Sequence, residues 1–115
     1  EIDAELELGG ANADLAEKIA MLEPFGAANE EPLLEIVNIQ LSSPMIIGSG
    51  HVRCFLRSDN GKSLKAIAFK VADSELGKAL LTGAGDRFNV VGYLRVDNWQ
   101  NQNLVQFVIV DAKRL

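Results

Sequence analysis

The sequence is poor in the residues that form covalent and metal cross-links. Its 115 residues include one cysteine, Cys54, and one histidine, His51. A single cysteine excludes an internal disulfide, and this pair alone cannot supply the ligands of a structural zinc site. Because disulfides persist in oxidising compartments, the scarcity of cysteine favours the reducing cytoplasm. A chain of this length can bury about two thirds of its unfolded surface in one domain, so neither cross-link is required.

Long apolar runs are also absent. The uninterrupted apolar stretches are only a few residues long, and no basic segment precedes a hydrophobic one. This pattern excludes a transmembrane helix and a signal peptide, and we expect no contact with a membrane. Because the chain begins at Glu1 rather than at methionine, we expect it to be a fragment of a longer polypeptide.

Positive charge is scarce in the first half of the chain. Residues 1–50 contain ten acids and one base, a balance of −9, while residues 51–115 contain ten bases and six acids, a balance of +4. The resulting net charge of −5 argues against phosphate binding, but the basic second half permits it. Such asymmetry is a hint of nucleic-acid contact, although a solvated acidic face explains the first half equally well.

The first 32 residues predict two short elements and a linker. Alternation over residues 2–8 predicts a half-buried strand, whose partner we expect in the missing part of the polypeptide. Asn12 is a suitable N-cap for a helix that must end before Pro24. Residues 24–32, with two prolines, a glycine and an asparagine, indicate an irregular linker. We therefore predict a joint over residues 1–32 and a separate domain over residues 33–115.

The second region predicts a β-barrel. Five runs rich in Val, Ile, Leu and Phe are separated by small and polar residues: Leu33–Leu41, His51–Ser58, Ser63–Val71, Arg87–Asp97 and Leu104–Asp111. Between the third and fourth runs, Asp73-Ser74 can cap a short helix that Gly83 ends. The order β-β-β-α-β-β is that of the five-stranded Greek-key OB fold, which binds oligonucleotides on its second and third strands. We predict a mainly β protein of this fold.

The second predicted strand has one apolar and one basic, aromatic face. Strand alternation directs Val52, Cys54 and Leu56 into the core, and directs four residues outward: His51, Arg53, Phe55 and Arg57. Guanidinium groups interleaved with a ring offer phosphate attraction together with base stacking, as single-stranded nucleic acid requires. The alternatives are that the arginines are merely solvated and that the Asn12–Glu23 helix covers the ring. Cys54 is expected to be an inert core residue.

The turn after this strand sets a predicted register. Asn60-Gly61 favours a tight turn that pairs Asp59 with Lys62. In that register Arg57 lies opposite Leu64, and the remaining outward residues lie opposite Ala66, Ala68 and Lys70, while Ile67 and Phe69 enter the core. The two alanines would leave a shallow floor where a nucleotide approaches the sheet.

The remaining candidates come from other strands and loops. Residues 42–50 are expected to form a long loop before the second strand, and Tyr93 and Arg95 share one side of the fourth strand. Trp99 lies among amide side chains, where it either stacks on a base or packs under its own loop. The predicted DNA-binding residues are His51, Arg53, Phe55, Arg57, Lys70, Tyr93, Arg95 and Trp99. We exclude the acids of residues 1–31, which we expect to be solvated or to face a partner.

The segment from Leu22 to Pro32 resembles the RecJ family of bacterial exonucleases specific for single-stranded DNA. The family pattern is Pro-Phe-Gly-x-Gly-Asn-Pro-Glu-Pro, and the residues that match it are Pro24, Phe25, Gly26, Asn29, Glu31 and Pro32. Ala28 replaces the second glycine of this pattern and Glu30 replaces its middle proline. Further matching stretches are Ile2–Leu6, Gly50–Arg53, Lys65–Phe69 and Asn98-Trp99.

This resemblance implies a part of a 5′-to-3′ exonuclease of DNA recombination and repair. The family's metal-dependent Asp-His-His domain, which uses Mg or Mn, would lie upstream, because one histidine cannot form a paired metal site. For this chain we expect no catalytic residue, no metal and no cofactor. The implied partners are single-stranded DNA and the upstream nuclease domains of the same polypeptide. The alternative is a protein-docking module that contacts the nuclease core or a repair protein.

Overall fold

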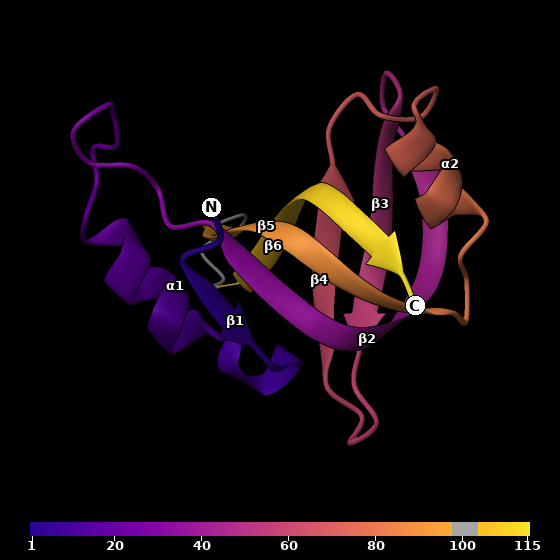
Figure 1. Ribbon diagram of the computed structural model, residues 1–115, viewed down its shortest axis with the longest axis horizontal. Helices are drawn as coiled ribbons and strands as arrows, with labels where there is room; N and C mark the ends of the chain where they lie inside the picture. Colours follow the sequence, from indigo (N-terminus) through magenta and orange to yellow (C-terminus); the bar gives the residue numbers. More distant parts are fainter. Residues whose placement is uncertain (98–103) are drawn as a thin grey trace.

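The computed structural model describes residues 1–97 and 104–115, in which one curved sheet is combined with short helices (Figure 1). The elements in chain order are β1 (Ala4–Leu6), the 3₁₀ helix η1 (Leu8–Gly10), α1 (Ala13–Ala20), β2 (Leu34–Ile47), β3 (His51–Arg57), β4 (Ser63–Ala68), α2 (Glu75–Leu81), β5 (Arg87–Asp97) and β6 (Leu104–Arg114). The predicted order of strands and helices is therefore confirmed.

Strands β2 to β6 close into a barrel. The sheet order is β1-β2-β3-β4-β6-β5, and β5 also pairs with β2, so the five later strands form a ring. The pairing of β4 with β6 is parallel, whereas the other contacts of the ring are antiparallel. Phe88 and Phe107 are the largest fully buried side chains of the core inside this ring. The closure and the helix between β4 and β5 confirm the OB fold.

Both helices begin at the predicted caps. The side chain of Asn12 accepts a hydrogen bond from the backbone N–H of Leu15, and that of Ser74 accepts one from Gly77. Figure 1 shows α1 and α2 on opposite sides of the barrel. Within the described ranges, no helix is long and apolar enough to cross a membrane.

The first strand finds its partner within this chain. Strand β1 runs parallel to β2, with Ala4 opposite Leu34 and Leu6 opposite Ile36. Asp3 strengthens the pairing, since its backbone N–H donates to Leu33 and its carboxylate accepts from the Leu33 N–H, both at 2.8 Å. The expectation of a partner outside the chain was wrong. A parallel pair requires a crossover connection, here made by α1 and the linker, and no local sequence signal reports that pairing.

Strand β2 is longer than predicted. It continues through Ile47, so most of the expected loop over residues 42–50 is strand, and only a short turn joins it to β3. The ladder with β3 is interrupted between Ser42 and Met45, and Ser43 has a φ of 52°. Pro44 lies in this irregularity, where its missing N–H does not break a ladder hydrogen bond.

The hairpin between β3 and β4 differs from the prediction by one residue. Ser58 donates its backbone N–H to Lys62 at 3.0 Å, so the turn contains three residues and ends at Gly61, whose φ is 87°. Phe55 consequently faces Lys65 rather than an alanine. The predicted register and its alanine floor were wrong, because Asn-Gly serves here in a three-residue turn.

The corrected register exchanges the two faces of β4. The alanines at positions 66 and 68 are fully buried in the core. Ile67 is only partly buried, and Phe69 is 49% exposed, so neither belongs to the core as predicted. A shift of one residue moves every side chain of a strand to the opposite face.

Candidate nucleic-acid interface

Strand β3 presents the predicted side chains on its outer surface. Arg53 and Phe55 are partly exposed and Arg57 is exposed, while the alternating Val52, Cys54 and Leu56 are completely buried. Burial raises the pKa of the Cys54 thiol to about 12, which leaves it protonated and unreactive at neutral pH. The alternation predicted for this strand is therefore confirmed.

Two rows of side chains run across four neighbouring strands in the order β3, β4, β6, β5. The first row is Arg53, Ile67, Val108 and Tyr93, and the second is Phe55, Lys65, Gln106 and Arg95. We call the surface formed by these eight residues the four-strand face. It brings Tyr93 and Arg95, which are distant in sequence, onto the same surface as the predicted residues of β3.

Arg53 is held in place without a carboxylate. Its Nη2 donates to the sulfur of Met45 at 2.7 Å, and its guanidinium carbon lies 5.8 Å from the centroid of the Phe55 ring. Its Nε is buried and has no hydrogen-bond partner in the described part of the chain. Neither Arg53 nor Arg57 forms an ion pair with a described acidic residue. Their positive charge is therefore available to a phosphate group.

His51 and Lys70 lie together beside the turn between β2 and β3. The His51 Nδ1 accepts a hydrogen bond from the Lys70 backbone N–H at 2.9 Å, and its ring meets that of Phe69 edge to face at 5.3 Å. His51 thus supports the backbone of Lys70, whose φ is 55° and whose side chain is exposed.

Arg95 is neutralised at the far end of the four-strand face. Its Nε and Nη2 donate to the two carboxylate oxygens of Glu31 at 3.0 and 2.9 Å. Hydrogen bonding to Glu31 raises the pKa of Arg95 above its ordinary value. The Glu31 side chain is only 17% exposed, so the expectation that this acid is solvated was wrong. Tyr93 lines a cavity shared with Glu1, Asp3, Glu30 and Glu31, so this end of the face is acidic.

The sequence prediction missed several members of the four-strand face. Lys65, Ile67, Gln106 and Val108 were not proposed, because alternation alone does not determine which strands are neighbours or how they are aligned. Lys65 forms an ion pair with Asp97, with 3.1 Å between Nζ and the carboxylate. Counting the turn before β4 as three residues would have placed Lys65 and Ile67 outward. Trp99 lies outside the described residues.

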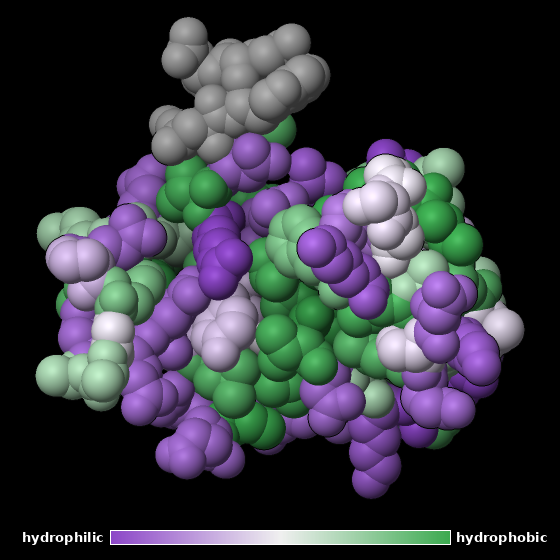
Figure 2. Space-filling model, turned by 90° about the horizontal axis from the view of Figure 1, so that it is seen from above, coloured by the Kyte–Doolittle hydropathy of each residue, from purple (hydrophilic) through white to green (hydrophobic). Residues whose placement is uncertain are grey.

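Apolar and polar areas alternate on the surface. Seen from above, hydrophobic residues form a continuous central area that hydrophilic residues border (Figure 2). On the four-strand face, the partly exposed Ile67 and the buried Val108 are adjacent across β4 and β6, between Arg53 on one side and Tyr93 on the other. An apolar floor flanked by aromatic rings and guanidinium groups suits bases and phosphates respectively.

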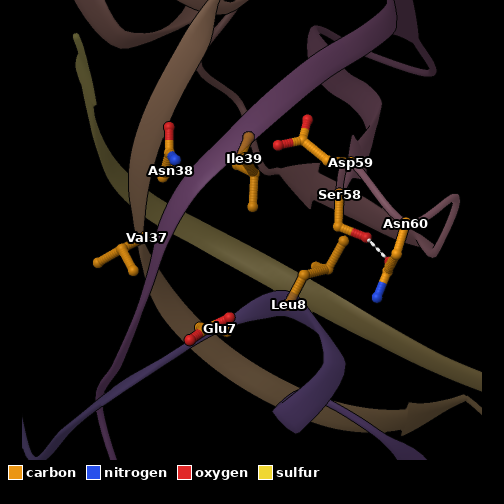
Figure 3. A pocket seen from close by; sticks show the side chains of 8 residues that line it. All are labelled: Glu7, Leu8, Val37, Asn38, Ile39, Ser58, Asp59 and Asn60. Atoms are coloured by element: carbon orange, nitrogen blue, oxygen red, sulfur yellow. Dashed lines mark hydrogen bonds between the residues drawn. The ribbon is translucent and has the colours of Figure 1, made fainter.

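A separate cavity of about 450 Å³ is less suited to an anion. It lies between η1, β2 and the turn after β3, and its lining includes the carboxylates of Glu7 and Asp59 but no lysine or arginine (Figure 3). Figure 3 shows the hydrogen bond that the hydroxyl of Ser58 donates to the side-chain oxygen of Asn60. Among the described residues, no group of three His, Cys, Asp or Glu side chains could hold a metal ion.

Comparison with known proteins identifies the family of this chain. Residues 2–111 match the RecJ OB domain. The chain is 30% identical over 94 residues to the single-stranded-DNA-specific exonuclease RecJ of Bacillus subtilis (strain 168), a match that covers 80% of this chain and 11% of that protein.

Two solved structures share the fold. RecJ of Thermus thermophilus in complex with Mn²⁺ has a TM-score of 0.70 and 22% identity, covering 99% of this chain and 16% of that one. The small single-stranded DNA-binding protein of Streptomyces coelicolor has a TM-score of 0.52 and 17% identity, covering 72% of this chain and 91% of that one. The family match and the barrel topology agree, and the chain belongs to the RecJ OB domain family.

Proposed function

We propose that this chain binds single-stranded DNA on the four-strand face and guides it to a nuclease domain of the same polypeptide. The observation that carries the proposal is the register that aligns Arg53 and Phe55 of β3 with Ile67 and Lys65 of β4. These two strands correspond to the second and third strands of the barrel, on which OB folds bind oligonucleotides.

The names of the relatives support the same ligand. The Bacillus subtilis relative is a single-stranded-DNA-specific exonuclease, and the Streptomyces coelicolor structure is a single-stranded DNA-binding protein. By this proposal the chain acts in DNA recombination and repair in the cytoplasm. It does so without catalysis, since a divalent ion for phosphodiester hydrolysis would be held by the rest of the polypeptide. Residues 1–32 act as the joint to that part.

Oligonucleotide binding by the isolated chain tests the proposal directly. A labelled single strand of about 16 nucleotides, the upper size covered by one OB fold, is titrated with the protein at low salt and its fluorescence anisotropy is recorded. We expect saturable binding that a duplex of the same sequence does not reproduce. Arg53→Ala and Arg57→Ala should each weaken it. If both variants bind as the parent does, the four-strand face is the wrong surface.

A docking function is the second candidate, and it concerns a different surface. Met21 and Leu22, directly after α1, are 82% and 52% exposed, which is unusual for large apolar side chains beside a packed helix. This surface could contact the upstream nuclease domains or a repair protein. Met21→Ser together with Leu22→Ser should weaken association with separately produced nuclease domains while leaving oligonucleotide binding unchanged. Unchanged association would exclude the exposed pair as the contact.

A further inference from the structure

We propose that a second cavity, beside the four-strand face, is a subsite for one unpaired nucleotide of the bound strand. This inference rests on the proposed function and adds the path of the strand. The cavity has a volume of about 510 Å³, within the roughly 300–1,000 Å³ of ligand pockets in proteins. It lies between the turn that precedes α1, the β3–β4 hairpin and the start of β6. We call it the lysine cavity.

The lysine cavity is continuous with the four-strand face. Phe55 and Lys65 belong to both, and the outward-facing Ser63 lies between them and the hairpin turn. A DNA strand that contacts Arg53 therefore reaches the cavity by passing over the ring of Phe55. The opposite exit passes Tyr93 and Arg95, where the acids of residues 1–31 gather and would repel phosphates. Repulsion by these acids therefore favours a path of the DNA strand toward the lysine cavity.

The lining of the cavity matches the two parts of a nucleotide. Its apolar wall is formed by Leu8, Ala11, Phe55, Leu64, Leu104 and Val105. Its charged groups are Lys62 and Lys65, of which Lys65 is paired with Asp97, and no carboxylate of the described residues lines it. A base can stack on the ring of Phe55 while a phosphate oxygen accepts from a lysine ammonium.

Leu8 separates this cavity from an unsuitable neighbour. The same side chain also lines the cavity of Figure 3, whose charged lining groups are Glu7 and Asp59. Lysines therefore line one cavity and acids the other, with Asp59 of the acidic pair bound to Arg87. The aliphatic stem of Lys62 lies beside Gly9, where an added Cβ would lie 3.5 Å from Cδ and Cε.

Two substitutions alter the cavity and leave the four-strand face intact. Lys62→Gln removes one charge, and Gly9→Leu adds a side chain directed at the Lys62 stem and fills the space. Gly9 does not have a positive φ, so this change is compatible with its backbone. Gly26→Leu is the matched control, because an added Cβ there meets nothing within 4 Å and the site lies in the linker.

The test combines affinity with nuclear magnetic resonance. Because stacking of one base is worth roughly 1–3 kcal/mol, Gly9→Leu should weaken binding of the single strand about tenfold, whereas Gly26→Leu should bind as the parent does. Titration with deoxythymidine monophosphate should shift the backbone amides of Gly9, Phe55 and Leu104. Thermal unfolding of Gly9→Leu near the parent's midpoint shows that a loss of affinity is not a loss of fold.

The outcomes distinguish this proposal from the broader one. A parent that binds no oligonucleotide overturns both. If the parent binds the oligonucleotide, Gly9→Leu and Lys62→Gln bind it with equal affinity, and the amide shifts are confined to the outer face of β3 and β4, only the subsite is overturned. Inorganic phosphate that reproduces every shift also overturns the subsite, because it shows an anion contact without a base.

Discussion

The salt dependence of binding gives the sharpest test of the electrostatic reasoning. Four cations on or beside the four-strand face form no ion pair with a described acid: Arg53, Arg57, Lys62 and Lys70. For single strands, each neutralised phosphate contributes about 0.7 to the slope of log affinity against log salt concentration. With four contacts the slope is about −2.8, so raising salt from about 50 to 200 mM should weaken binding about 50-fold.

The double variant Arg53→Gln with Arg57→Gln removes two of these four charges. Its slope should fall to about −1.4, and the same change in salt should weaken binding only about sevenfold. The control is Lys78→Gln with Lys113→Gln, which removes the same charge from α2 and from the far end of β6. That control should keep the parent's slope.

Anisotropy titrations at several salt concentrations measure all three slopes. Equal slopes for the parent and the Arg53/Arg57 variant would refute the assignment of phosphates to β3. Equal losses of slope in both double variants would refute it too, because they would show that only net charge matters. A parent whose affinity is independent of salt would exclude phosphate contacts altogether.

Three further predictions concern single residues. Glu31→Gln frees the guanidinium of Arg95, so the salt slope should become steeper by about 0.7; an unchanged slope would mean that the strand does not reach this end of the face. Gly92→Ala should destabilise the fold by about 3 kcal/mol or more in urea unfolding, because its Cβ would lie 1.9 Å from a backbone oxygen of β6, whereas Gly26→Ala should be nearly neutral. Cys54, whose pKa is raised to about 12, should react with iodoacetamide at about pH 8 more than a hundredfold more slowly in the native than in the unfolded chain, and equal rates would contradict its burial. The same shift implies that this thiol does not lower the free energy of unfolding below the pKa of the unfolded thiol. As pH rises from there toward about 12, the free energy of unfolding declines, because only the unfolded chain then releases the proton.

Local physical rules were sufficient for much of the fold. The caps at Asn12 and Ser74, the order of the strands and the buried face of β3 each depend on residues a few positions apart. Hydrogen bonds from a side chain to the next turn, and the two-residue period of a strand, are properties of short segments. Interactions between near neighbours in the chain therefore account for the element types, the OB order and the side of β3 that carries Arg53 and Phe55.

The neighbours of those residues across the sheet depend on contacts between distant segments. The pairing of β1 with β2, the three-residue turn before β4 and the alignment of β4 with β6 depend on hydrogen bonds between distant segments. These pairings place Lys65 beside Phe55 and set Arg95 against Glu31, which gives the interface a basic end and an acidic end. A shift of one residue in register would exchange both faces of β4, and local propensity cannot exclude that shift. Only packing of the alanines of β4 into the closed barrel does so.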